Sequence, residues 1–247
     1  MRNKIGLNLA TNYSINFSLP KRKKKNIKFI VIHYTGMRKE AEAIHKLGDR
    51  NSKVSAHYFI KNNGQILKMV PDLYEAWHAG ISRWKSFKSL NKYSIGIEIN
   101  NPGHFNKYKN FSDKQIFSLK KLLKFLIKKY NIEVHNLLGH SDIAPDRKID
   151  PGEKFPWKEL FKNHLCKWHR LDRKVLRKLR YKKLSNKDSS QFFKNLLKIG
   201  YRKIPGINLY KNYRYLTFAF QRRFRQELVN GKTDKECLLI SNNLTKH

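Results

Sequence analysis

Acidic residues are scarce in this chain. It has 18 aspartates and glutamates against 54 lysines and arginines, which gives a formal net charge of +36 over 247 residues. Cysteine is also rare, because Cys166 and Cys237 are too few for a disulfide framework and form no CxxC pair. No apolar run approaches the ~18 residues that a membrane-spanning helix needs, which excludes an integral membrane protein. The N-terminal stretch contains Arg2 and Lys4 but is then interrupted by polar residues, so it makes a poor signal-peptide core.

The composition that is present belongs to a folded protein. Hydrophobic residues make up 40% of the chain and aromatic residues 13%, which excludes a disordered polycation. The length allows one or two domains. The excess of positive charge favours an anionic partner, such as nucleic acid, an anionic membrane surface or a carboxylate-rich polymer. Composition alone would place nucleic acid first, and the motifs described below change that order.

Hydrophobic periodicity predicts an α/β protein with a mixed central sheet flanked by helices. Strands are expected at 27–34, 54–61, 66–70, 94–100 and 134–139, and helices at 40–47 and 113–130. The turn at residues 62–65 (NNGQ) predicts a hairpin, so one strand pair should be antiparallel. Ser112, with Gln115 three residues later, predicts a capping box at the start of the longer helix.

The chain divides into four expected segments. These are an exposed N-terminal lead-in at 1–26, a main domain at 27–165, a basic linker at 166–187, and a small all-α domain of three helices at 188–247. The last segment adds no candidate ligand or base to the residues considered next. We therefore expect residues 1–165 to fold alone and to keep the chemistry.

Three separated segments carry residues suited to catalysis. His33 ends a predicted strand and Glu98 lies within the strand SIGIEIN. The segment GHSDIAPDRKIDPG at 139–152, whose prolines and glycines predict a loop, holds His140, Lys148 and Asp150. Two imidazoles and one carboxylate suit a catalytic zinc site, which uses three protein ligands and leaves a position for water. Each residue also has an ordinary interpretation: a core histidine, a turn-forming aspartate before proline, or a solvent-facing glutamate.

Six motifs occur in order between Asn12 and Trp157: NYSINFS, VIHYTGM, SAHYFIKNNGQI, AWHAG, SIGIEINNPGH and GHSDIAPDRKIDPGEKFPW. Here the sequence resembles the zinc-dependent N-acetylmuramoyl-L-alanine amidases of the type-2 amidase family, in particular their AmpD/AmiD-like subgroup, which share the fold of the peptidoglycan-recognition proteins. The resemblance implies that 27–165 is a zinc amidase catalytic domain with one zinc ion. The implied ligands are His33, His140 and Asp150, with Glu98 as the acid/base and Lys148 as the stabiliser of the oxyanion.

The same resemblance implies a reaction and a partner. Such an enzyme hydrolyses the amide between the lactyl group of N-acetylmuramic acid and L-alanine, in peptidoglycan or its (anhydro)muropeptide fragments. Residues 188–247 resemble the three-helix peptidoglycan-binding module often attached to these amidases, although the stretch 203–215 is more basic and aromatic than expected. We expect a monomer that binds no nucleic acid. A periplasmic or cell-wall location is favoured, and a cytoplasmic one is the alternative.

Two other functions compete with this interpretation. A non-catalytic peptidoglycan binder or sensor on the same fold is disfavoured because all three implied ligands, Glu98 and Lys148 are present. A nucleic-acid-binding protein is suggested by the charge and by the basic segment 165–183, but no recognised nucleic-acid-binding module is found. Of two further histidines in the motifs, His57 is expected in the core and His78 in the wall of a groove.

Overall fold

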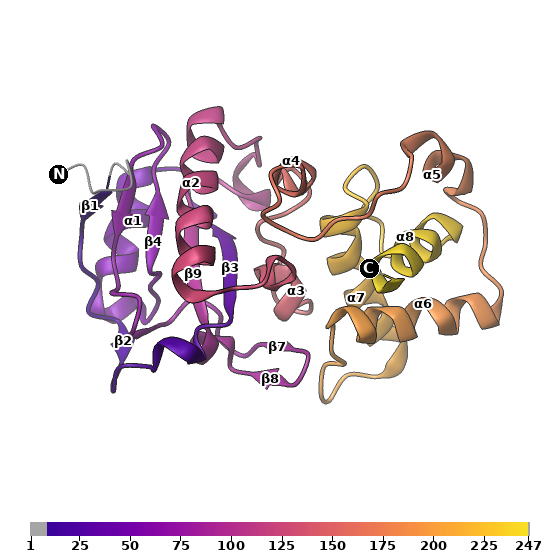
Figure 1. The fold of residues 1–247 in the computed structure, drawn as a ribbon, viewed down its shortest axis with the longest axis horizontal. Helices are drawn as coiled ribbons and strands as arrows, with labels where there is room; N and C mark the ends of the chain where they lie inside the picture. The colour runs from indigo at the N-terminus through magenta and orange to yellow at the C-terminus, as the bar shows by residue number, and fades with distance from the viewer. Residues whose placement is uncertain (1–8, 247) are drawn as a thin grey trace.

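A six-stranded mixed sheet forms the centre of the protein in a computed structural model that describes residues 9–246 (Figure 1). The strand order is β1-β5-β4-β9-β3-β10, with β4 and β5 antiparallel and the other neighbours parallel. The strands are β1 (Leu9–Thr11), β3 (Phe29–Tyr34), β4 (Tyr58–Ile60), β5 (Ile66–Lys68), β9 (Ser94–Ile99) and β10 (Leu137–Gly139). Two small sheets pair β2 (Phe17–Ser18) with β6 (Glu75–Ala76), and β7 (Arg83–Trp84) with β8 (Phe87–Lys88).

Helices surround this sheet and also build a separate half of the molecule (Figure 1). They are α1 (Glu40–Gly48), α2 (Asp113–Tyr130), α3 (His140–Ile143), α4 (Trp157–Lys162), α5 (Arg173–Leu179), α6 (Asn186–Ile199), α7 (Leu209–Phe224) and α8 (Lys235–Lys246). In Figure 1, α3 and α4 lie between the sheet and the group formed by α5 to α8. Across residues 9–246, no helix combines the length and the apolar character needed to cross a membrane.

The two faces of the central strands have different roles. Ile95, Ile97 and Ile99 of β9 are completely buried, and they join the core beneath α2. Successive residues of a strand point to opposite faces, so Gly96 and Glu98 face the other way. That second face is covered by α1 at one side and by the C-terminal helices at the other. His33 and Glu98, two of the predicted site residues, lie on this second face.

Local sequence signals determine the long helix α2. The Ser112 side chain accepts a hydrogen bond from the Gln115 backbone N–H, and the Gln115 side chain accepts one from the Ser112 backbone N–H. The helix ends at Tyr130, and the next residue, Asn131, caps it in a left-handed conformation at φ 52°. The predicted capping box, helix and 62–65 hairpin are confirmed, as is the mixed sheet.

Most of residues 9–26 are exposed, as predicted for the lead-in at 1–26, but the segment is not separate from the main domain, and residues 1–8 lie outside the described region. Strand β1 pairs in parallel with β5 and extends the central sheet. The Asn16 side chain is buried and donates hydrogen bonds to Asp49 O and Val54 O at 2.8 and 3.0 Å. Strands β1 and β2 in this segment are only three and two residues long. Their hydrophobic pattern is therefore too short to recognise in the sequence, and distant partners stabilise them.

The segment 166–187 is likewise more than a linker, because it contains α5. Leu176 of α5 is buried in a cluster that includes Phe192, Ile240 and Leu244 of the C-terminal helices. Helices α6, α7 and α8 provide the three predicted helices, and α5 packs against α8 as a fourth. The high density of Lys and Arg suggested a solvated linker, whereas Leu176 packs α5 onto the C-terminal helices.

The predicted catalytic loop at 139–152 begins as a helix. His140 is the first residue of the one-turn helix α3, directly after β10. The predicted strand at 134–139 is correspondingly shorter, since residues Val134–Asn136 form a 3₁₀ turn. The strand-to-helix corner between β10 and α3 therefore sets the position of His140.

Candidate metal centre

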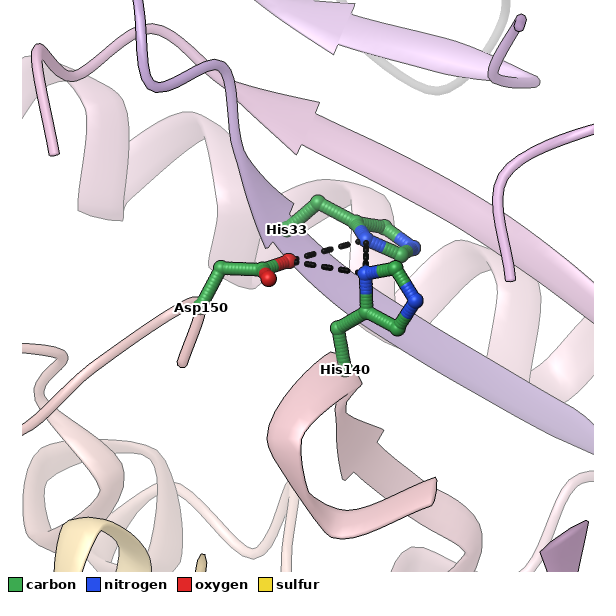
Figure 2. Close-up of side chains that lie close together, drawn as sticks. All are labelled: His33, His140 and Asp150. Atoms are coloured by element: carbon green, nitrogen blue, oxygen red, sulfur yellow. Dashed lines mark hydrogen bonds and ion pairs between the residues drawn. The ribbon is translucent and has the colours of Figure 1, made fainter. Parts of the chain in front are cut away.

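The side chains of three predicted site residues lie close together in the structure. His33 comes from the end of β3, His140 from the start of α3, and Asp150 from the segment that follows α3 (Figure 2). The two Nδ1 atoms lie 2.9 Å apart, and Asp150 Oδ2 lies 3.0 Å from that of His33 and 3.1 Å from that of His140. All three side chains are buried. Residues that are far apart in sequence thus present three ligand atoms to a common centre.

Hydrogen bonding fixes the tautomer of His140. Its Nε2 lies 3.1 Å from Ala79 O, and a carbonyl oxygen can only accept a hydrogen bond. The Nε2 atom must therefore carry the proton. In a neutral imidazole the Nδ1 atom then carries no proton and has a free lone pair. This is the atom that points at the cluster.

A longer chain of hydrogen bonds fixes the tautomer of His33. The Ser94 hydroxyl donates to Leu90 O at 2.6 Å, so Ser94 Oγ accepts from His78 Nε2 at 3.2 Å. His78 Nδ1 is then an acceptor, and it receives the Nε2–H of His33 at 3.0 Å. The Nδ1 atom of His33 consequently carries no proton and also has a free lone pair. His78 lines a cleft, as expected, and also hydrogen-bonds to a predicted ligand.

Two imidazole lone pairs and a carboxylate oxygen therefore face one another. Three acceptor atoms at about 3 Å repel one another unless a proton or a metal ion lies between them. Burial, together with the neighbouring His140, lowers the pKa of His33 to about 4, so His33 is neutral near pH 7. Neutral imidazoles and a carboxylate are the forms that bind a metal ion. The cluster is compatible with a metal site in its residue types, tautomers and geometry.

Glu98 lies beside this cluster on the same face of the sheet. The parallel register places it opposite His33 on the neighbouring strand. Burial, reinforced by the charge of Asp150, raises the pKa of Glu98 to about 8. Among the described residues no group hydrogen-bonds to its buried Oε2 atom. A buried acceptor without a partner is costly in a protein interior, which indicates a group reserved for a ligand. The interpretation of Glu98 as a solvent-facing strand residue is therefore disfavoured.

The three ligand candidates and Glu98 line a cleft of about 290 Å³. Lys148 lines the same cleft, so all five predicted site residues lie in or around it. Its walls also contain residues that sequence reasoning did not select: Met37, Lys46, Trp77, Phe105 and Arg147. Phe105 is 90% exposed at the rim. Arg147 and Trp77 stand next to Lys148 and His78 in the motifs, and this adjacency was the only sequence signal for them.

Glycine at position 96 makes room for the histidine chain. A Cβ atom at Gly96 would lie 2.4 Å from His78 Cγ, which is closer than real atoms approach. Only glycine therefore allows the His78 ring to pack on β9 behind His33. His57, expected in the core, is completely buried, and its Nδ1 accepts the Gly96 N–H at 2.9 Å.

The fold and the cluster define an α/β protein with a site suited to a metal ion. Residues 23–153 match the family model described as N-acetylmuramoyl-L-alanine amidase. Over 227 residues the chain is 34% identical to N-acetylmuramoyl-L-alanine amidase AmiD of Escherichia coli K12, covering 87% of this chain and 81% of that protein. The chain belongs to the N-acetylmuramoyl-L-alanine amidase family, as the sequence motifs imply.

Solved structures agree with this assignment. E. coli AmiD, in complex with the substrate anhydro-N-acetylmuramic acid-L-Ala-D-gamma-Glu-L-Lys, matches with a TM-score of 0.79 at 32% identity over 93% of this chain and 92% of that one. AmpDh3 of Pseudomonas aeruginosa, in complex with anhydromuramic pentapeptide, matches with a TM-score of 0.77 at 30% identity over 93% and 94% of the two chains. In a comparison of sequences rather than structures, AmpD of Haemophilus influenzae is 41% identical over 106 residues. These cover 42% of this chain and 55% of that protein.

Proposed function

We propose that this protein is a zinc-dependent amidase that cleaves the bond between the lactyl group of N-acetylmuramic acid and L-alanine. One observation carries the proposal: two imidazole lone pairs, a carboxylate and the unpartnered Glu98 face one cleft in a chain of this family. His33, His140 and Asp150 would hold the ion. Zinc in such a site supplies a Lewis acid for the carbonyl oxygen and makes water more acidic.

Glu98 is the proposed acid/base. A general acid/base works best when its pKa lies near the operating pH, and burial raises the pKa of Glu98 to about 8. It would take a proton from the attacking water and deliver it to the departing amine of L-alanine. Its register position opposite His33 on the neighbouring strand supports a role beside the centre, outside the proposed ligand set.

Lys148 is the proposed stabiliser of the negative charge that develops on the carbonyl oxygen. It lines the same cleft as Glu98 and the ligand candidates. A preorganised cation near the developing charge lowers the barrier and requires little reorganisation during the reaction. Lys148 would thus stabilise the developing charge, and Glu98 would transfer the proton.

The proposed substrates are peptidoglycan and its soluble (anhydro)muropeptide fragments. The structures of AmiD and AmpDh3 hold anhydromuramyl peptides, and both cover more than nine tenths of this chain. The carboxylates of the stem peptide would be attracted to a chain of net charge +36, and Lys46 and Arg147 add cations to the cleft wall. We also propose that the protein acts as a monomer and works in the periplasm or at the cell wall.

The decisive experiment compares purified sacculi with a soluble anhydromuropeptide. Products should be identified by mass spectrometry, and the bond cut should be the one between the muramyl lactyl group and L-alanine. Chelation should abolish turnover and added zinc should restore it. Full activity in protein shown to be free of metal would contradict the zinc proposal, and release of any other fragment would contradict the proposed bond. Fractionation of cells that produce the chain would test its location.

A further inference from the structure

The C-terminal helices share a hydrophobic core with the sheet that carries the site. One buried cluster combines Phe29 and Val31 of β3 and Leu138 of β10 with Leu196 of α6 and Phe220 of α7. Phe29 and Val31 belong to the same strand face as His33, because alternate residues point the same way. The C-terminal half therefore packs directly against the elements that position the candidate metal ligands.

A buried ion pair lies at the centre of this contact. Arg223 of α7 and Asp142 of α3 have side chains that are 3% and 1% exposed, and their Nη1 and Oδ2 atoms lie 2.5 Å apart. Tyr201, which follows α6, donates its hydroxyl proton to Asp142 Oδ1 at 2.8 Å. The Arg223 guanidinium also lies 4.4 Å from the centre of the Trp157 ring. Residues from the C-terminal half thus supply the partners for a carboxylate of the catalytic half.

The same groups hold the corner from which His140 projects. Arg223 Nη2 donates to Leu137 O at 2.7 Å, and the Gly139 N–H donates to Asp142 Oδ2 at 2.8 Å. These atoms belong to β10 and to the first turn of α3, on either side of His140. Movement of this corner would move the His140 ring relative to His33 and Asp150.

We propose that Arg223 is a positioning residue for His140. It acts through Asp142 and Leu137, which hold the β10–α3 corner in the geometry that brings the His140 Nδ1 atom to the cluster. The C-terminal helices therefore help to position a proposed metal ligand, in addition to any part they have in binding the cell wall. This inference rests on the proposed function insofar as His140 is taken to be a metal ligand.

The chain offers a matched control two residues further on. Arg225 is 1% exposed and pairs with Asp234 and Glu236, which both lie in the C-terminal half. Arg223→Met and Arg225→Met therefore each remove a buried arginine that pairs with carboxylates. Only the first change touches the corner that carries His140. A general loss of stability should affect both variants, whereas a positioning role should separate them.

The experiment measures zinc affinity by competition with a chelator, and the stability of the metal-free protein by urea unfolding. We expect Arg223→Met to weaken zinc binding by roughly 10–100-fold, the range for residues that orient metal ligands. Arg225→Met should lose stability but keep the affinity of the unchanged protein. With Co²⁺ as the probe, the absorption bands should shift in Arg223→Met and stay unchanged in Arg225→Met.

Milder variants cover the case in which Arg223→Met does not fold. Arg223→Lys keeps the charge beside Asp142 but cannot also reach Leu137 O as a planar fork does, so its zinc affinity should be intermediate. Asp142→Asn should lower the affinity in the same direction. Unchanged affinity in Arg223→Met and in both milder variants would overturn the proposal, and so would equal losses in Arg223→Met and Arg225→Met.

The outcomes also separate this inference from the proposed function. If the unchanged protein binds zinc but does not cleave muropeptides, the proposed function fails and the affinity comparison still decides the role of Arg223. If the unchanged protein binds no zinc, both proposals are overturned together.

Discussion

Two buried carboxylates on the short segment 139–152 meet opposite surroundings. Asp142 faces the C-terminal helices, where the Arg223 guanidinium and the Tyr201 hydroxyl satisfy it. Asp150 faces the cleft, where its neighbours are the Nδ1 atoms of His33 and His140. The first carboxylate is electrically compensated within the protein. The second lies among acceptor atoms that need a proton or a metal ion between them.

This difference shows how one short segment of chain serves two purposes. A buried carboxylate needs a partner for its charge and for its hydrogen bonds. Where the chain provides the partner, as at Asp142, the result is a rigid contact between the two halves. Where the chain provides no cationic partner, as at Asp150, the result is a cluster compatible with a metal site. The predictions below test this contrast, beginning with the largest expected effect.

Removing a ligand candidate should abolish the site. We expect His140→Ala to lose zinc and to fall to the activity of metal-free protein, because two ligands do not replace three. Zinc content by atomic absorption and turnover of a soluble anhydromuropeptide are the measurements. His169→Ala is the control, since His169 is also buried but lies outside the cluster. A His140→Ala protein with one tightly bound zinc would remove His140 from the ligand set.

Changing Glu98 should separate chemistry from metal binding. Glu98→Gln keeps the shape of the side chain but cannot accept the proton, so the rate should fall by roughly 10²–10⁴-fold. Zinc content and substrate affinity should stay the same, because Glu98 is outside the ligand set. Measurement of kcat together with zinc content tests this expectation. Wild-type turnover in Glu98→Gln would rule out the proposed acid/base.

Lys148→Met should slow the reaction by roughly 10²–10³-fold, the loss seen when one donor to an oxyanion is removed. The effect should fall on kcat rather than on zinc content. Lys46→Met removes the same charge from another wall of the cleft and is the matched control. Equal effects of the two substitutions would indicate that Lys148 contributes only general charge.

His78→Phe should weaken the metal site without removing a ligand. It takes away the acceptor for the Nε2–H of His33, so zinc affinity should fall by roughly 10–100-fold. Competition with a chelator measures the change. His78→Gln retains a side-chain acceptor and should recover part of the affinity. Unchanged affinity in His78→Phe would show that the histidine chain has no part in orienting His33.

Asp72 is a third buried carboxylate, and its substitution should change the free energy of unfolding but not metal binding. Burial opposes the ionisation of Asp72, but hydrogen bonds from Lys129, Tyr130 and Tyr58 outweigh burial and lower its pKa from 3.8 to about 2. The resulting stabilisation, about 2 kcal/mol at 1.36 kcal/mol per pKa unit, is fully present above pH 3.8. It is lost as the pH falls towards 2, because the native carboxylate then takes up a proton.

Asp72→Asn should therefore lower the free energy of unfolding at pH 7, and its difference from the unchanged protein should shrink between about pH 4 and pH 2. Urea unfolding across this range is the measurement, and zinc affinity should not change. Glu42→Gln, at an exposed ion pair, is the control and should have little effect. A pH-independent difference would mean that Asp72 acts through packing rather than through its charge.

Truncation bears directly on the comparison of the two halves. The sequence predicts that residues 1–165 fold alone and keep the chemistry. The shared core and the Arg223–Asp142 pair argue against it, because the fragment would expose Phe29 and Val31 and leave Asp142 without its arginine. We expect the fragment to lose activity on soluble and insoluble substrates alike. Full activity on soluble muropeptides would restore the original prediction.

Local signals determined much of the fold. The Ser112–Gln115 capping box, the hairpin turn at 62–65 and the alternating isoleucines of β9 each depend on neighbouring residues, and so the sequence alone reveals them. The motif order likewise identified the family, and it selected five residues that the fold gathers in or around one cleft. Their individual roles stay predictions.

Tertiary structure alone decided the rest. The pairing of β1 with β5 and the burial of Leu176 of α5 depend on partners far away in the chain, and β1 is too short to carry a pattern of its own. The Nδ1 lone pairs of His33 and His140 point at the cluster because two backbone carbonyls accept hydrogen bonds: Ala79 O from His140 Nε2, and Leu90 O from Ser94 at the end of the chain that leads to His33. A backbone carbonyl has the same chemistry in every residue, so no sequence pattern marks these two, and only folding brings them into place.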